Sequence, residues 1–293
     1  MSPPQRLATM AASPSQARTM KVEPLHPDVV MFVGDEYESV ATAFFDGDDA
    51  LLVDALAGEE DARQLREVLC GQLGKNVRAV VSTHRMSDHM AGLTLFPQAL
   101  SIAQRHHRHT FLSQNRRVDA YYREPKLVFD GALSLRWGRH ELHLLHNPGK
   151  TLDHVSVDAP VADLVCVGDN IVGRIVYLSK ADPAQLRGAI DRIKQLGRGT
   201  VIGGHMGRFP AAVLDQALHY LDRLRETVVR IRSQAPPALT ERRIRAIAIE
   251  DCVAAGVEPT PFEREWHGHN LDVVVGQSVF ALDAALAARE ARA

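Results

Sequence analysis

The sequence lacks three features that would each point to a particular class of protein. Its 293 residues contain no apolar run near the ~18 residues that a membrane span requires. Lys plus Arg (34) nearly equals Asp plus Glu (36), so no basic excess favours binding of nucleic acid. The three cysteines are far apart and form no CxxC pair, which argues against a disulfide framework and favours a reducing compartment. We therefore expect a cytoplasmic protein that binds neither membranes nor nucleic acid.

Histidine, by contrast, is abundant, with 14 His beside 9 Phe and 5 Tyr. Imidazole is the commonest metal ligand among the side chains, so this composition directs the search toward metal chemistry. The apolar fraction of 45% and the charged fraction of 24% are ordinary for a globular protein. The length allows one large domain or two ordinary ones.

Three regions can be distinguished along the chain. Residues 1–20 are rich in Pro, Ser and Ala and lack the apolar core of a secretory signal, so they are predicted to form a disordered tail. Residues 21–210 alternate short β segments with helical segments, which predicts a layered α/β domain. Residues 211–293 are predicted to form a helical C-terminal extension that packs on this domain.

Hydrophobic periodicity and turn residues locate the individual elements. We expect strands over residues 29–33, 40–45, 51–54, 77–82, 126–129, 133–137, 141–146, 155–158, 164–167 and 200–203. We expect helices over residues 59–73, 183–196, 211–233, 240–255 and 271–292.

The most informative stretch is a hydrophobic strand that runs directly into a loop with His84, Asp88 and His89. A strand end is a rigid place from which imidazole and carboxylate groups can converge on a cation. Three further strands end in polar, glycine-containing loops: Pro148-Gly149-Lys150, Gly168-Asp169 and Gly204-His205. Four such loops in one chain indicate a single site.

This order of motifs resembles that of the metallo-β-lactamase-fold hydrolases, which carry a His-x-His-x-Asp-His loop, a Pro-Gly-His-Thr loop, a Gly-Asp strand end and a final Gly-His. The resemblance covers about residues 28–210. It implies a four-layer αββα sandwich of the α/β class, with a site at the sheet edges for two zinc or iron ions that activate a bridging hydroxide. Asp54, at a strand end, resembles the buried structural aspartate of the family.

The resemblance also assigns site residues by position. His84 falls on the first ligand of metal site one. Asp88, His89 and His205 fall on the three protein ligands of site two. Asp169 falls on the carboxylate that bridges the two metals.

Two positions depart from the family pattern. Met86 replaces the second His of site one, and Lys150 replaces the His of Pro-Gly-His-Thr. A thioether is a poor zinc ligand and an ammonium repels a cation, so we expect site one to be weak or empty and one zinc or iron ion to be bound. The Lys150 ammonium could instead offset Asp169 and bind a substrate oxyanion or carboxylate. His146 and His154 are candidate substitutes for the missing ligand.

Two other histidine clusters have less specific interpretations. Residues 106–109 open a helical segment rich in Arg and are interpreted as a solvated face or the rim of a substrate site. His267 and His269 resemble part of a helical lid, and either line the pocket or lie outside it. Cys166 lies in an apolar strand and is expected to be a buried, inert thiol.

Our leading hypothesis is a metal-dependent hydrolase of a small ester, thioester, lactone or related acyl substrate, with Asp88, Lys150 and Asp169 as catalytic groups. Two alternatives stay open. Two His and one carboxylate are also the ligands of mononuclear non-haem iron oxygenases. A non-catalytic, ligand-binding or regulatory protein on a decayed scaffold is the other alternative. We expect a small-molecule substrate as partner, and C-terminal helices that either cap the pocket or form a homodimer interface.

Overall fold

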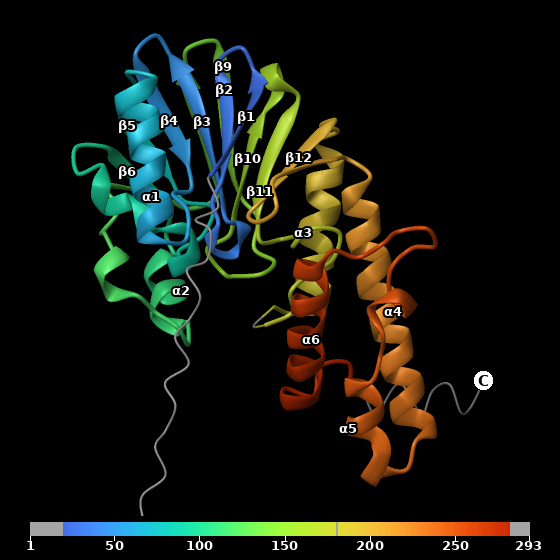
Figure 1. Ribbon diagram of the computed structural model, residues 1–293. Helices are drawn as coiled ribbons and strands as arrows, with labels where there is room; N and C mark the ends of the chain where they lie inside the picture. Colours follow the sequence, from blue (N-terminus) through green and yellow to red (C-terminus); the bar gives the residue numbers. More distant parts are fainter. Residues whose placement is uncertain (1–19, 180, 282–293) are drawn as a thin grey trace, which may run out of the picture.

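The computed structural model describes residues 20–179 and 181–281. Two β-sheets pack face to face, and helices cover their outer faces (Figure 1). This is the four-layer αββα sandwich of the α/β class that the sequence predicted. Residues 1–19 of the expected tail lie outside the described residues. The described helices include none that is long and apolar enough to cross a membrane.

The first sheet has seven strands in chain order. Strands β1 to β4 form an antiparallel meander, and β4 to β7 run parallel. We did not predict β1, a largely exposed edge strand interrupted by Pro24, or the short β6. The bounds are β1 (Lys21–His26), β2 (Val29–Val33), β3 (Val40–Asp46), β4 (Asp49–Val53), β5 (Asn76–Val81), β6 (Leu100–Gln104) and β7 (Leu127–Phe129).

The second sheet has six strands in the order β13-β12-β11-β10-β9-β8. All pairs are antiparallel except β11 with β12. The bounds are β8 (Ala132–Trp137), β9 (His140–His146), β10 (Val155–Ala159), β11 (Leu164–Gly168), β12 (Thr200–Gly203) and β13 (Arg208–Pro210).

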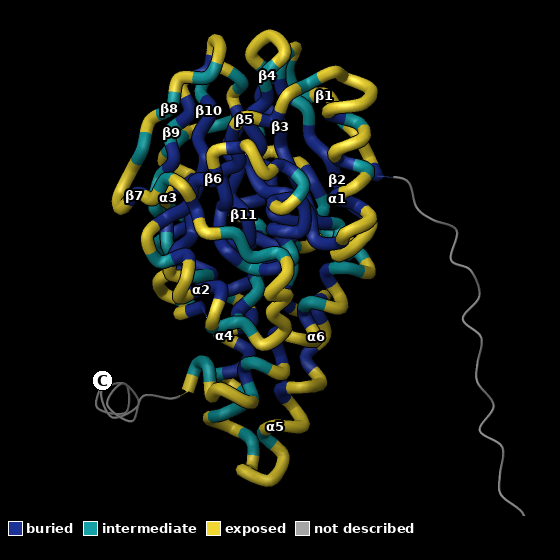
Figure 2. The backbone as a smooth tube through the Cα atoms, turned by 90° about the vertical axis from the view of Figure 1, so that its left-hand side faces the viewer, coloured by how far each residue is buried: buried dark blue, intermediate teal, exposed yellow. Residues whose placement is uncertain are grey.

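Three apolar clusters hold the layers together. Alternate residues of both sheets, such as Met31, Phe44 and Val157, fill the space between the sheets. Outside the first sheet lie α1 (Glu59–Arg66), which continues as a π-helical turn to Gln72, and α2 (His107–Ser113). Outside the second lie α3 (Pro183–Gln195) and α4 (Val213–Gln234). Figure 2 shows the central strands buried inside these layers, with exposed stretches on outer strands such as β1 and β8 and on the outer helices.

The C-terminal helices begin earlier than predicted. Helix α5 (Pro237–Arg245) starts at a proline in its first turn, and residues 249–251 form only a 3₁₀ turn. Helix α6 (Pro261–Gly276) starts at a capping box, in which Thr260 and Glu263 bond each other's backbone N–H. The expected helix over 271–292 was therefore wrong in its start and over residues 277–281, which are not helical, and its part beyond residue 281 lies outside the described residues. Leu271 and Val274 of α6 belong to the same apolar cluster as α4, so this region packs on the sandwich.

Candidate metal centre

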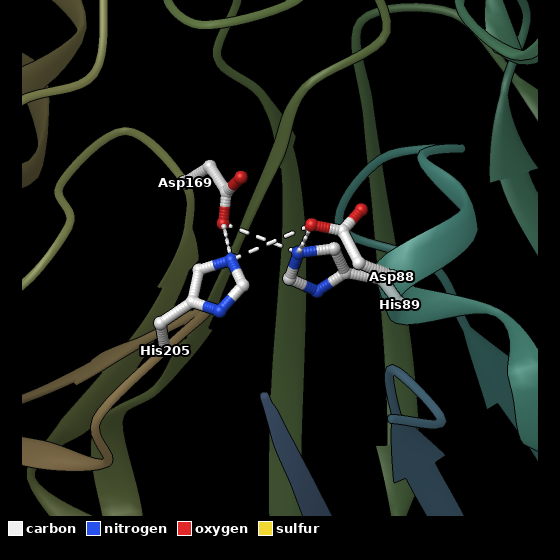
Figure 3. Close-up of side chains that lie close together, drawn as sticks. All are labelled: Asp88, His89, Asp169 and His205. Atoms are coloured by element: carbon white, nitrogen blue, oxygen red, sulfur yellow. Dashed lines mark ion pairs between the residues drawn. The ribbon is translucent and has the colours of Figure 1, made fainter. Parts of the chain in front are cut away.

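Four donor groups from three strand ends converge at one edge of the sandwich (Figure 3). Asp88 and His89 lie in a 3₁₀ turn shortly after β5, Asp169 follows β11, and His205 lies shortly after β12. The Nε2 atoms of His89 and His205 lie 3.2 and 3.3 Å from Oδ1 of Asp169. The same two nitrogens lie 3.9 and 3.7 Å from Oδ2 of Asp88. Imidazole nitrogens and carboxylate oxygens at this spacing suit a divalent zinc or iron ion.

Neighbouring groups hold both imidazoles with Nε2 directed at the cluster. His205 Nδ1–H donates a hydrogen bond to the Tyr37 carbonyl (2.7 Å). His89 Nδ1 lies 3.3 Å from Oδ2 of Asp54, whose carboxylate accepts from the backbone N–H and hydroxyl of Thr83. The hydrogen bond to Tyr37 fixes the tautomer of His205 that a metal requires, whereas His89 Nδ1 approaches Asp54 but makes no hydrogen bond among the described residues. Asp54 thus lies beside the site, as the resemblance implied.

The cluster contains polar atoms that the described protein leaves without partners. Within residues 20–179 and 181–281, His89 Nε2 and Asp169 Oδ1 are buried and have no hydrogen-bond partner. Burial alone disfavours the charged form of His89, but Asp169 and Asp88 raise its pKa well above the ordinary value. Burial likewise opposes ionisation of Asp169, but Lys150 and the histidines hold its pKa well below the ordinary value. The donor set therefore fits a cation.

Lys150 and His84 both face the second carboxylate oxygen of Asp169, Oδ2. Lys150 Nζ donates to Asp169 Oδ2 at 2.9 Å, with both side chains buried, and lies 4.7 Å from the centroid of the Tyr177 ring. His84 Nε2 is 3.5 Å from the same oxygen. His84 therefore lies beside the four-donor cluster and is not one of its members. The ammonium therefore lies on the same side of Asp169 as His84, the residue that the resemblance assigns to the first metal site.

The structure does not bring His146 or His154 into the four-donor cluster. His146 Nε2 donates to the Leu152 carbonyl (2.8 Å). The His154 ring packs edge-on against His84, with a centroid separation of 4.6 Å. Burial, followed by the neighbouring His84, lowers the pKa of His154 well below its ordinary value, which keeps this ring neutral.

A cavity of about 680 Å³ opens above the cluster, between α2 and α6. Asp88, Lys150 and Asp169 line it, as does Met86. The sequence analysis missed several other lining residues, which come from distant segments: Tyr37, Arg116, Tyr121, Tyr177, Glu265 and Trp266. The i, i+3 spacing of Trp266 and His269 on one helix face was the available signal for part of this wall.

The two remaining histidine clusters divide between cavity and core. His109 and His269 line the cavity. His107 is only 6% exposed, so the interpretation of residues 106–109 as a solvated face was wrong at this position. Its ring nitrogens lie near the Gln104 carbonyl and Glu124. His267 is buried, with Nδ1 2.9 Å from the Tyr220 hydroxyl.

Burial raises the pKa of the Cys166 thiol to about 12, as expected for an inert cysteine.

Comparison with known proteins agrees with this geometry. The family model of the metallo-beta-lactamase superfamily matches residues 34–205, more than half of the chain, so the protein belongs to this superfamily. No curated protein matches the sequence.

Solved structures of similar fold include two metallo-beta-lactamases. One, from Pontibacter korlensis, has a TM-score of 0.58 and 18% identity, and the match covers 67% of this chain and 96% of that one. The other, DIM-1 metallo-beta-lactamase, has the same TM-score and identity, with 68% and 94% covered. At this identity, the likeness shows the fold alone.

Gly204→Ala should disrupt the metal centre. An added Cβ would lie 2.8 Å from Cε1 of His89 and collide with Oδ1 of Asp169. Because displaced ligands hold metal poorly, we expect the affinity for Zn²⁺ to fall by about tenfold or more. Equilibrium dialysis with elemental mass spectrometry measures this. Gly268→Ala on α6, where a Cβ would meet nothing within 4 Å among the described residues, is the matched control and should bind as the wild type does. Unchanged affinity in Gly204→Ala would contradict the geometry.

Proposed function

We propose that the protein is a metal-dependent hydrolase that acts on a small ester, thioester, lactone or related acyl substrate with one resident ion. The ligands would be Asp88, His89, Asp169 and His205. The observation that carries this proposal is that the two carboxylate oxygens of Asp169 have different partners. Oδ1 faces two imidazoles, and Oδ2 accepts a hydrogen bond from the Lys150 ammonium. Oδ1 is thus available to a metal, whereas Oδ2 is already paired with the positive charge of Lys150.

A divalent metal bound at this cluster would lower the pKa of a coordinated water toward ~7 and polarise the acyl carbonyl. The Asp88 side chain is 23% exposed and lines the cavity, so it can accept a proton from the attacking water. Lys150 uses one of its three N–H donors on Asp169 and also lines the cavity, so it can donate to the oxyanion that develops on the substrate. A cavity of about 680 Å³ accommodates a small-molecule substrate.

The same donors support a second candidate, a mononuclear iron oxygenase. Two imidazoles with carboxylates are the ligand set of non-haem Fe(II) enzymes. The metal at this cluster distinguishes the two candidates: zinc that is lost in the variant with His89→Ala and His205→Ala favours the hydrolase, and iron with oxygen-dependent turnover favours the oxygenase.

His89→Ala combined with His205→Ala should remove one equivalent of metal per chain and abolish hydrolysis. Loss of a residue that only hydrogen-bonds a metal ligand lowers metal affinity or activity by about 10- to 100-fold. Loss of two ligands should therefore lower kcat/KM by more than ~100-fold. Elemental mass spectrometry and a panel of activated esters, thioesters and lactones measure the two quantities. His143→Ala, which removes a histidine whose ring bonds Ser134 and not the cluster, is the control. A double variant that hydrolyses like the wild type would overturn the proposal.

Lys150→Met should separate catalysis from metal binding. The variant removes the proposed oxyanion donor while keeping an unbranched side chain in the same buried position. Because the ammonium also keeps Asp169 ionised, we expect the metal to bind more weakly, and at saturating Zn²⁺ we expect kcat to fall by about 10²–10³-fold, the usual effect of losing one such donor. Steady-state kinetics beside metal analysis gives both values. Full kcat with bound metal would exclude Lys150 from the chemistry.

Met86→His together with Lys150→His should create the missing first metal site. These changes restore the family motif around His84 and remove the ammonium that lies on Oδ2 of Asp169. We expect one more equivalent of Zn²⁺ per chain than in the wild type, measured by elemental analysis after dialysis. Met86→His alone leaves the ammonium in place and should bind no additional ion. If the double variant also binds no more zinc than the wild type, Lys150 does not occupy the position of that metal.

A further inference from the structure

A second group of imidazole and carboxylate side chains lies at the opposite edge of the sandwich. His26 and Asp28 belong to the β1–β2 hairpin of the first sheet, and His140 is the first residue of β9 in the second sheet. Strand β9 runs from His140 to His146, four residues before Lys150. The group is therefore separated from the candidate metal centre by the length of a strand.

The donor atoms of this group converge on one point. His140 Nε2 lies 3.0 Å from Oδ1 of Asp28, and His26 Nδ1 contacts the same oxygen. All three donor atoms lie within 4.8 Å of one another. Two imidazole nitrogens and one carboxylate oxygen suit a zinc-like ion, with a fourth position left for water.

His140 has no other way to satisfy its polar atoms. The residue is 0% exposed, and within the described part of the chain neither ring nitrogen makes a hydrogen bond. The approach of Nε2 to Asp28 is close but lacks hydrogen-bond geometry. Leaving a buried polar atom unpaired costs about 1–3 kcal/mol, and a cation at Nε2 would remove that penalty. His26 and Asp28, with side chains 23% and 16% exposed, give an ion access from solvent.

The two hairpins are held rigidly against each other. The backbone N–H of Phe45 donates to the Asp28 carbonyl (2.8 Å), which ties the first hairpin to β3. Trp137 Nε1–H donates to the Phe44 carbonyl (2.9 Å), which ties the β8–β9 hairpin to the same strand. Donors on rigid strands pay little conformational entropy when an ion binds.

Arg139 does not compete for the same oxygen. Its Nε lies 2.9 Å from Oδ2 of Asp28, whereas both imidazoles face Oδ1. The Arg139 side chain is 62% exposed, so solvent screens its charge from the group.

We propose that His26, Asp28 and His140 form a second binding site for a divalent transition metal, with zinc as its simplest occupant. The ion would join a hairpin of the first sheet to a hairpin of the second, at the end of the sandwich remote from the cavity. Its role would be structural, because the ion would join the two hairpins and none of its three ligands lines the cavity beside the candidate metal centre.

Zinc stoichiometry tests this site. Wild type, His26→Ala and Asp28→Asn are dialysed against buffered micromolar Zn²⁺, and zinc per chain is measured by elemental mass spectrometry. We expect each variant to hold one equivalent less than the wild type. His26 ends β1 and Asp28 lies in the turn that follows, and both side chains are partly exposed. Two independent variants guard against a failure to fold, which circular dichroism detects. Zinc should also raise the Tm of the wild type more than that of either variant.

His143→Ala is the matched control, because it removes an imidazole of the same strand without touching the group. It should retain the full zinc content. The proposal fails if folded His26→Ala and Asp28→Asn hold as much zinc as the wild type, or if His143→Ala loses an equivalent as they do. A loss caused by His89→Ala with His205→Ala should add to the loss caused by His26→Ala, so failure of one site is distinguishable from failure of the other.

Discussion

The ion pair between Lys150 and Asp169 is the interaction on which the rest of the site depends. Both side chains are buried, and an isolated charge at either position would be costly. The ammonium keeps Asp169 ionised and holds it through Oδ2, which leaves Oδ1 to face His89 and His205. A protonated Asp169 would be a much weaker ligand. The lysine that removes one family metal ligand therefore preserves the carboxylate that the other site needs.

The strands determine where this carboxylate and its partners can meet. Asp169 and His205 follow the neighbouring parallel strands β11 and β12, and the loop after β5 brings His89 from the other sheet. Gly204 lets the backbone of β12's loop approach Asp169 and His89 without a side chain between them. The arrangement thus rests on paired strand ends and one small residue, which are features of the fold and not of the metal.

Much of the fold was predictable from the sequence, because strand patterns are local, and the family resemblance of the strand-end motifs indicated the four side chains that the structure brings together. The start of α6 was also encoded locally, in the Thr260–Glu263 capping box, but it was overlooked. The cavity wall was not predictable in this way, since Tyr177 and Trp266 meet only after α6 packs against the sandwich. The resemblance assigned His84 a ligand role in the first metal site. The structure adds what sequence spacing could not supply: His84 Nε2 faces Oδ2 of Asp169, the oxygen that Lys150 binds, and its ligand role stays a prediction.

The two histidine–carboxylate groups show why donor chemistry alone does not define a function. His26 and His140 lie more than a hundred residues apart in the sequence. They meet at Asp28 because the β1–β2 hairpin packs against the β8–β9 hairpin. Their carboxylate is balanced by an exposed arginine and opens onto the surface of a turn. The carboxylate of Asp169 is balanced by a buried lysine that also faces a cavity wide enough for a substrate. The proposed metal at His26, Asp28 and His140 would join the sheets. The proposed metal at the Asp169 cluster would instead act beside a cavity where a substrate, a proton acceptor and an oxyanion donor can meet.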